Sequence, residues 1–170
     1  MATEEQTIID GQWSLHYANS GMGQYIIIPT GRIVTNLNFP MQKIGNPGSG
    51  TITYYILDWS DKSTLTSQAW GNPQSVSTSM TWYPLELSTP WVSTGNRVWI
   101  GFRNTGSGAA GNGIGSFAAY SSVKADEALS GTNWVPNVSG YDVGYIYTYS
   151  EKPPAGGGGN APLLVADGKI

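Results

Sequence analysis

The chain has 170 residues and a net charge of −3, with only 11% charged residues, 23 Gly, 10 Pro and no Cys. This composition predicts one all-β domain of short strands and many turns, and it excludes disulfides, thiol catalysis and zinc–thiolate sites. Because Lys and Arg are not in excess, counterion release from a phosphate backbone would contribute little, and we expect no nucleic acid partner.

The N-terminal segment, residues 1–7, is acidic and polar. It lacks the basic and apolar regions of a secretory signal, so we expect a protein made in a cytoplasm without a signal peptide. No apolar run approaches the roughly 18 residues that a membrane-spanning helix needs, and no membrane partner is expected.

Alternating apolar residues predict strands in the first part of the chain. Residues 7–17 give two short strands around the Asp10-Gly11 turn signal, and residues 24–29 give a third. A longer strand is predicted over 32–42, where five residues recur at every second position: Ile33, Thr35, Leu37, Phe39 and Met41.

The segment from Lys43 to Thr53 connects this strand to the next through a glycine-rich turn around Pro47. Pro fixes φ and Gly permits positive φ, so the segment predicts a turn between two strands of a β-sandwich. The second face of the following strand is covered either by loops of the same chain or by a neighbouring subunit. Both faces of that strand are apolar, with Ile52, Tyr54 and Ile56 on one and Tyr55, Leu57 and Trp59 on the other.

The middle of the chain alternates between polar and strand-forming stretches. Residues 61–79 are polar and predict a loose excursion at the edge of a sheet. Residues 75–88 predict a strand in which Pro84 requires an edge position or a bulge. Over residues 97–104, one set of side chains is predicted to face the core, Val98, Ile100 and Phe102, and a second set the other side, Arg97, Trp99 and Arg103.

The last part of the chain combines short strands with glycine-rich segments. We expect an exposed loop over 105–115, short strands over 116–123 and 132–135, and a closing strand over 141–149. Residues 124–129 are the only plausible helical turn.

Two regions are predicted: a domain over 1–150, and a Pro/Gly-rich linker with a flexible C-terminal arm over 151–170. The apolar residues Leu163, Leu164 and Val165 near the end of the arm fit an arm that reaches a neighbour to add a strand or fill a groove. They fit equally a disordered tail with a few chance apolar residues.

Four stretches together resemble the choice-of-anchor type of jelly-roll β-sandwich: residues 43–53, Thr81-Trp82, residues 95–100, and Gly140-Tyr141-Asp142 before a final aromatic strand. The likeness covers most of residues 33–149. It implies a jelly-roll fold, as found in bacterial surface proteins and in structural proteins of tailed bacteriophages, often with carbohydrate-binding or assembly roles. Because the chain lacks a recognisable signal peptide, repeats and an anchor, the phage-structural branch is favoured.

Residues that could carry catalysis are few. His16 is the one histidine, and no Gly-x-Ser-x-Gly pattern accompanies it, so a Ser-His-Asp site is not expected. The glycine clusters lack the Lys-Ser/Thr of a phosphate loop and no calcium loop is spelled out, so no cofactor or metal is expected. Six carboxylates are candidates for glycoside cleavage, although turn carboxylates are ordinarily just solvated: Asp58, Asp61, Glu86, Asp126, Glu127 and Asp142.

Tryptophan is abundant, and its flat apolar ring can stack on a sugar or fill a protein interface. Trp99, flanked by Arg97 and Arg103 on the outward side of its strand, is the first candidate for sugar stacking. Composition does not choose between the two uses. The other candidate rings are Trp59, Trp82, Trp91 and Trp134.

The sequence favours a non-enzymatic virion structural protein of a tailed bacteriophage, either a capsid decoration protein or an accessory tail subunit, with a homotrimer as the expected oligomer. Expected partners are other virion proteins, such as the major capsid or tail protein. The alternative is a carbohydrate-binding β-sandwich module with a glycan as its ligand. The predicted subunit or shell contact consists of Tyr55, Leu57, Trp59, Trp99, Leu163, Leu164 and Val165.

Overall fold

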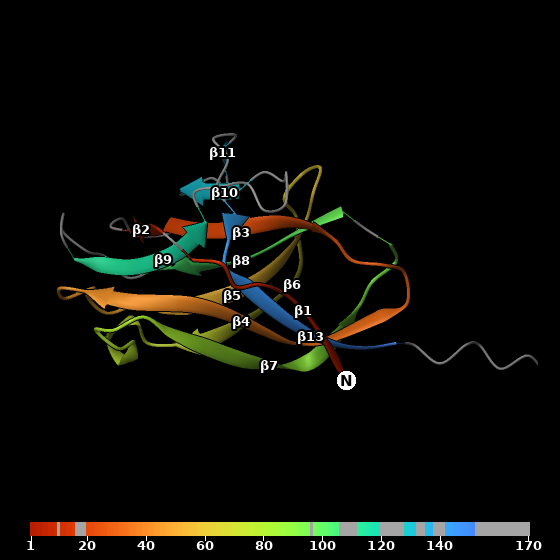
Figure 1. The fold of residues 1–170 in the computed structure, drawn as a ribbon, viewed down its shortest axis with the longest axis horizontal. Helices are drawn as coiled ribbons and strands as arrows, with labels where there is room; N and C mark the ends of the chain where they lie inside the picture. The colour runs from red at the N-terminus through yellow and green to blue at the C-terminus, as the bar shows by residue number, and fades with distance from the viewer. Residues whose placement is uncertain are drawn as a thin grey trace, which may run out of the picture.

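The computed structural model describes residues 1–9, 11–15, 20–95, 97–105, 112–119, 128–131, 135–137 and 142–151. These residues form two antiparallel sheets that pack face to face, which confirms the predicted all-β sandwich (Figure 1). Within the described ranges, the only helical element is the short 3-10 turn η1 (Pro73–Ser75). Accordingly, the described part of the chain contains no helix with the length and hydrophobicity needed to span a membrane.

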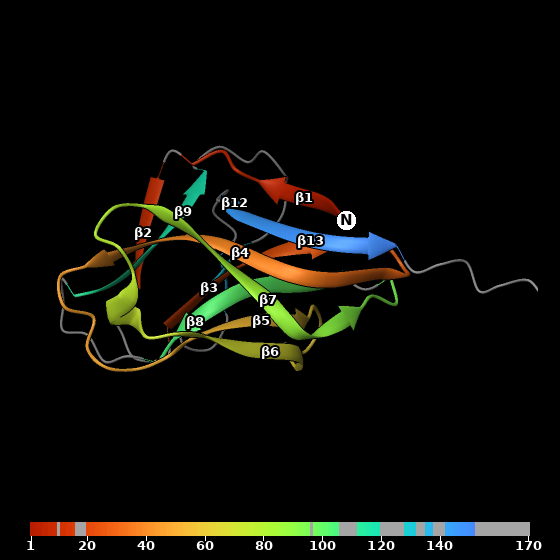
Figure 2. The same ribbon diagram turned by 90° about the horizontal axis from the view of Figure 1, so that it is seen from below.

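The first sheet is built around the long strand β4. Its strand order is β1-β13-β4-β9-β12, with β2 also paired to β9 and β7 also paired to β4 (Figure 2). The seven strands are β1 (Ala2–Gln6), β2 (Gly11–Leu15), β4 (Arg32–Ile44), β7 (Thr81–Val92), β9 (Gly113–Ala119), β12 (Asp142–Val143) and β13 (Tyr145–Glu151).

The second sheet has six strands in the order β11-β10-β3-β8-β5-β6. In the pairing of β3 with β8, Tyr25 lies opposite Trp99, and in the pairing of β5 with β8, Leu57 lies opposite Trp99. The six strands are β3 (Ser20–Ile27), β5 (Ile52–Asp58), β6 (Thr64–Gly71), β8 (Arg97–Asn104), β10 (Ala128–Gly131) and β11 (Val135–Asn137).

The predicted turn between β4 and β5 carries the chain from one sheet to the other. Gly45 and Gly48 adopt positive φ of 56° and 73°, a region that disfavours residues with a Cβ. Because β4 and β5 lie in different sheets, the turn forms no hairpin between them. The turn therefore connects the two sheets at this end of the sandwich, and Gly45 and Gly48 supply the positive φ angles that it needs.

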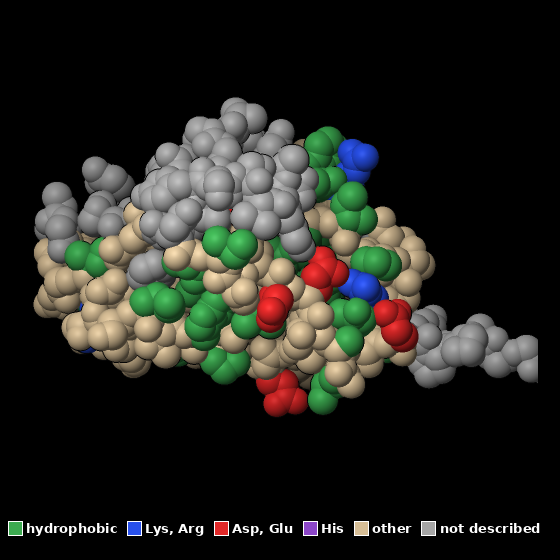
Figure 3. Space-filling view, in the orientation of Figure 1, with side chains coloured by type: hydrophobic (Ala, Val, Ile, Leu, Met, Phe, Trp, Pro, Cys, Tyr) green, Lys and Arg blue, Asp and Glu red, His purple; other side chains and the backbone are tan. Residues whose placement is uncertain are grey.

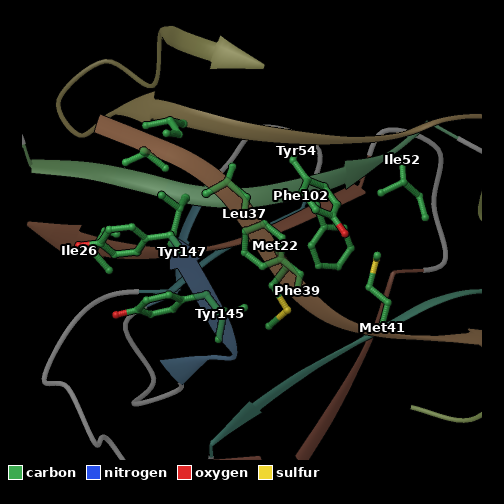
Figure 4. Packing of buried hydrophobic residues seen from close by; sticks show 14 of the residues in the cluster. Met22, Ile26, Leu37, Phe39, Met41, Ile52, Tyr54, Phe102, Tyr145 and Tyr147 are labelled. Atoms are coloured by element: carbon green, nitrogen blue, oxygen red, sulfur yellow. The ribbon is translucent and has the colours of Figure 1, made fainter. Parts of the chain in front are cut away.

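The core lies between the sheets and is rich in aromatic rings (Figure 4). The Phe39 ring centroid is 4.9 Å from that of Tyr54 and 5.5 Å from that of Phe102, so three strands from two sheets meet at one point. The predicted inward residues of β5 and β8 are all fully buried there: Ile52, Tyr54, Ile56, Val98, Ile100 and Phe102.

In β4, the predicted inward alternation holds only in the second half. Leu37, Phe39 and Met41 are buried as predicted, but Val34 takes the place expected for Ile33. The cause is a register shift between Val34 and Asn36 in the pairing with β7, which changes the phase of the alternation.

Strands β6 and β7 each lie at the edge of their sheet. Residues 64–71, predicted as a loose excursion, form the regular edge strand β6, because an edge tolerates polar side chains. Strand β7 pairs only with β4 in the described part of the chain, which agrees with the edge position inferred from Pro84. The Gln68 amide links the two edges, donating to Glu86 O at 2.8 Å and accepting from Ser88 N at 2.7 Å.

Two further expectations differ from the structure. The predicted helical turn over 124–129 is wrong at its end, because Ala128 and Leu129 pair with β3 as part of strand β10. The remainder of that segment is outside the described residues. The first strand is β1, which begins in the acidic start at Ala2, because its backbone completes the edge of the sheet beside β13.

Candidate binding surface

The outward face of the six-stranded sheet carries a second aromatic cluster, separate from the core. Trp99 and Leu57 form its buried centre, and Tyr25 and Tyr55 pack against them. The rings of Tyr25 and Trp99 meet edge to face, with centroids 5.6 Å apart. The cluster arises because β3, β8 and β5 each place large apolar or aromatic side chains on the outer face: Tyr25 from β3, Trp99 from β8, and Tyr55 and Leu57 from β5.

Trp99 is not the open sugar-stacking residue that the sequence suggested. Its side chain is only 1% exposed, and its indole N–H donates to the backbone oxygen of Trp59 at 3.2 Å. Leu57, a predicted contact residue, is 2% exposed. Since both side chains are already covered within one chain, neither offers a free surface to a sugar or to a neighbouring subunit.

The open part of this face lies at the end of β5. Trp59 is 39% exposed, and the Arg97 guanidinium lies 5.5 Å from its ring centroid. Ile27, at the end of β3, pairs with Arg97 and is 56% exposed. Sequence reasoning did not select Ile27 or Tyr25, although the unbroken run of apolar residues after Gln24 is a signal that both faces of β3 are covered or used.

The turn after β5 fixes the position of Trp59. The Asp58 carboxylate accepts hydrogen bonds from the hydroxyl and the backbone N–H of Ser60, and these bonds lower its pKa. Asp61 accepts from the Ser63 backbone N–H at 2.8 Å, which lowers the pKa of that carboxyl as well. These two candidates for glycoside cleavage therefore serve as caps of an exposed turn.

Two further predicted site residues, Arg103 and Tyr55, lie further along the same face. Arg103 is half-buried, with its guanidinium 5.8 Å from the ring centroid of Tyr55. Tyr55 is half-buried too, so it contributes only part of its ring to the surface. Three further predicted contact residues, Leu163, Leu164 and Val165, lie outside the described residues, as do Trp134 and His16.

Charged side chains gather on a different part of the molecule, where β1 and β13 lie (Figure 3). Arg32 donates to Glu4 at 2.7 Å and to the Tyr147 hydroxyl at 2.7 Å, and that hydroxyl donates to Glu4 at 2.9 Å. Burial alone would lower the pKa of Arg32, but the bond to Glu4 and the nearby tyrosines raise it. These hydrogen bonds among Glu4, Arg32 and Tyr147 join β1, β4 and β13, and their role is best explained as stabilisation of the fold.

Nothing in the described ranges assembles a reaction centre of a familiar kind. No set of three or more His, Asp or Glu side chains there is arranged to hold a metal ion. Asp142 is buried at the start of β12 and Glu86 lies on β7, in a different part of the sheet. Asp126 and Glu127 are outside the described residues.

No protein-family model matches the chain, and no curated protein matches it. Among solved structures, it is similar to a chain in "Structure of infectious bursal disease virus Gx strain", with 15% sequence identity and a TM-score of 0.39. The alignment covers 95% of this chain and 33% of that chain, so this chain spans about a third of the length of its structural neighbour. A likeness at this TM-score decides neither fold nor function.

Proposed function

We propose that the chain is a non-enzymatic structural subunit of a virus particle that works through protein–protein contacts. The observation that carries the proposal is the exposed Trp59 beside Arg97 and Ile27, on an otherwise well-covered sheet face. Trp and Arg are enriched at the energetic centres of protein interfaces, and an apolar pair at the surface is stabilised when a partner covers it.

The finer assignment rests on the sequence motifs that resemble choice-of-anchor jelly-roll domains. On that basis the particle is a tailed bacteriophage, and the chain is a capsid decoration protein or an accessory tail subunit that forms a homotrimer. The sandwich with its aromatic outer face is compatible with this assignment, because Trp, Tyr and Arg are enriched at protein interfaces.

Sedimentation velocity over a wide range of protein concentration tests the proposal. We expect the wild type to self-associate, and the Ile27→Ser variant to associate more weakly because it loses apolar area at the contact. Met80→Ser is the matched control, since Met80 is also exposed but lies just before β7, at the opposite end of that strand from the Trp59 surface. A wild type that stays strictly monomeric and retains no partner from a phage lysate would contradict the proposal.

Sugar binding is a second candidate, and it now depends on Trp59 instead of Trp99. The exposed indole with a cation beside it presents an apolar ring face next to hydrogen-bond donors, an arrangement suited to a pyranose. A glycan array comparing the wild type with Trp59→Ala separates the candidates. Saturable binding that is lost in the variant would favour a carbohydrate-binding module.

A further inference from the structure

Two strand residues and the first residue of the turn after β5 form a small contiguous surface, which we call the end patch: Ile27, Arg97 and Trp59. Ile27 lies opposite Arg97 in the β3–β8 pairing, and the Trp59 backbone N–H donates to Arg97 O at 3.2 Å. The Trp59 ring lies 6.3 Å from the ring of Tyr25, which is half-buried beside it. The patch is therefore apolar with one cation at its side.

The end patch is held in place before any partner arrives. The backbone oxygen of Trp59 accepts the bond from the buried Trp99 indole, and the Asp58 cap fixes the turn that follows. Surfaces that are already ordered lose less conformational entropy on binding, so more of the contact energy appears as affinity. A short apolar segment with a carboxylate near it would complement this surface in polarity and charge.

The chain itself contains such a segment, and the strand that leads to it, although it belongs to the other sheet, finishes at the same end of the sandwich as the patch. Strand β13 ends at Glu151, which lies opposite Arg32, and Arg32 follows Ile27 by only five positions through the turn closed by the bond from Arg32 N to Pro29 O. Figures 1 and 2 both show the end of β13 and the β3–β4 connection at the same end of the sandwich.

Beyond Glu151, residues 152–162 include two adjacent Pro and four consecutive Gly, and Leu163, Leu164, Val165 and Asp167 follow. A Gly-rich random coil of this length has an r.m.s. span of about 17–20 Å, enough to leave one sandwich and reach an adjoining copy. Arg97 makes no ion pair with any described carboxylate, so an incoming acidic side chain would find it available.

We propose that Leu163, Leu164 and Val165 of one copy cover the end patch of a second copy, with Asp167 beside Arg97. The inference rests on the proposed assembly function and names the contact that produces it. Apolar side chains of the arm are removed from water against Ile27 and Trp59, and the ion pair sets the register. Exchange of arms between copies makes each subunit both donor and acceptor, which is a route to a closed oligomer.

A charge-exchange experiment on the full chain tests this contact. Arg97→Asp and Asp167→Arg are each expected to weaken self-association at least about tenfold, because each places like charges together at the contact. A 1:1 mixture of the two variants should associate more strongly than either variant alone, since an arm of one variant then meets an opposite charge on the patch of the other. Sedimentation velocity of each variant alone and of the mixture measures this directly.

Two further variants separate the apolar contribution from the charge. Serine at all three of Leu163, Leu164 and Val165, and Trp59→Ala, should each weaken association about tenfold or more, as is usual for central interface residues. Met80→Ser should not. Circular dichroism of each variant checks that the fold is intact.

The outcomes distinguish the docking contact from the function that it serves. If the wild type associates and the arm and patch variants associate equally well, the docking contact is wrong while the assembly function stands. If Trp59→Ala weakens association but the triple-serine variant does not, the patch binds something other than the arm, and the occupant is wrong. If the mixture associates no more strongly than either variant alone, the pairing of Asp167 with Arg97 on a second copy is excluded. A wild type that remains monomeric contradicts both proposals.

Discussion

Both faces of the six-stranded sheet contain fully buried side chains, but the burial extends over more of each strand on the inner face than on the outer face. On the inner face, Val98, Ile100 and Phe102 of β8 are all fully buried against the other sheet. On the outer face, Trp99 is nearly as buried, but among the described residues the cluster around it consists of Leu57, Tyr25 and Tyr55, and the neighbouring Trp59 is exposed. Burial of one tryptophan therefore does not make the whole face a core.

This contrast teaches how a sandwich can present a candidate binding surface beside a buried cluster. The centre of the outer face contributes to folding through apolar burial, while its end is left open where the strands finish. The hydrogen bond from the Trp99 indole to Trp59 O joins the two parts. Substitutions along β8 and β5 can separate the contribution of the buried centre to stability from that of the exposed end.

The largest effect is expected on the inner face. Phe102→Ala removes a fully buried ring that contacts Phe39 and Tyr54, and it should lower the free energy of unfolding by about 3–5 kcal/mol. Urea denaturation followed by fluorescence measures this. A loss below about 1 kcal/mol would mean that the two sheets do not pack around this ring as described.

The next effect is expected at the centre of the outer face. Trp99→Ala should lower the free energy of unfolding by an amount at the lower end of the ~3–5 kcal/mol range for aromatic truncation, because the outer cluster has fewer members to leave unsupported. Trp99→Phe is the control, since it keeps an aromatic ring in the cluster while it loses the indole N–H and part of the ring area. If Trp99→Ala proves neutral, the outer cluster is a surface feature and the comparison of the two faces fails.

Much of this fold could be predicted from the period of the sequence, and the exceptions have local causes. The strand over 97–104 and its inward residues follow directly from alternation. Ile33 fails because a register shift near Asn36 changes the phase of β4, and a bulge leaves no mark in the pattern of apolar residues. The sheet that β5 joins after the glycine turn could not be predicted, since a turn sequence does not determine whether the next strand pairs with β4 or enters the other sheet.

The candidate binding surface was only partly predictable for a related reason. Alternation placed Trp99 on the outer face correctly, but exposure depends on neighbours across the sheet, and Tyr25 and Leu57 lie directly opposite it. Trp59, next to the same strands but beyond the end of β5, remains open. A sequence gives the face of a residue, whereas its accessibility depends on register between strands far apart in the chain.

A smaller effect is expected from the polar tip of a core ring. Tyr54→Phe removes the 2.7 Å hydrogen bond from the Tyr54 hydroxyl to Tyr83 O, and it should lower the free energy of unfolding by about 1 kcal/mol. Burial raises the pKa of Tyr54 above its ordinary value of 10.0. The contribution is therefore complete below pH 10 and is lost as pH rises toward the folded pKa, so the difference from the wild type should shrink in alkali. A difference that is constant up to high pH would contradict the buried hydroxyl.

The smallest effect is expected at the turn that carries Trp59, and its signature is the pH dependence. The Ser60 hydrogen bonds lower the pKa of Asp58 below its ordinary value of 3.8, so the ionised carboxylate stabilises the folded state above that pH, and the contribution is lost as pH falls through the depressed folded value. Asp58→Asn keeps an acceptor oxygen without the charge and should be slightly less stable than the wild type near neutral pH, with the gap closing in acid. Asp58→Ala, which also loses the acceptor, should remain less stable at every pH. Unfolding curves from neutral pH to pH 2 compare the three proteins, and a gap for Asp58→Asn that persists unchanged in acid would show that the charge is not what holds this turn.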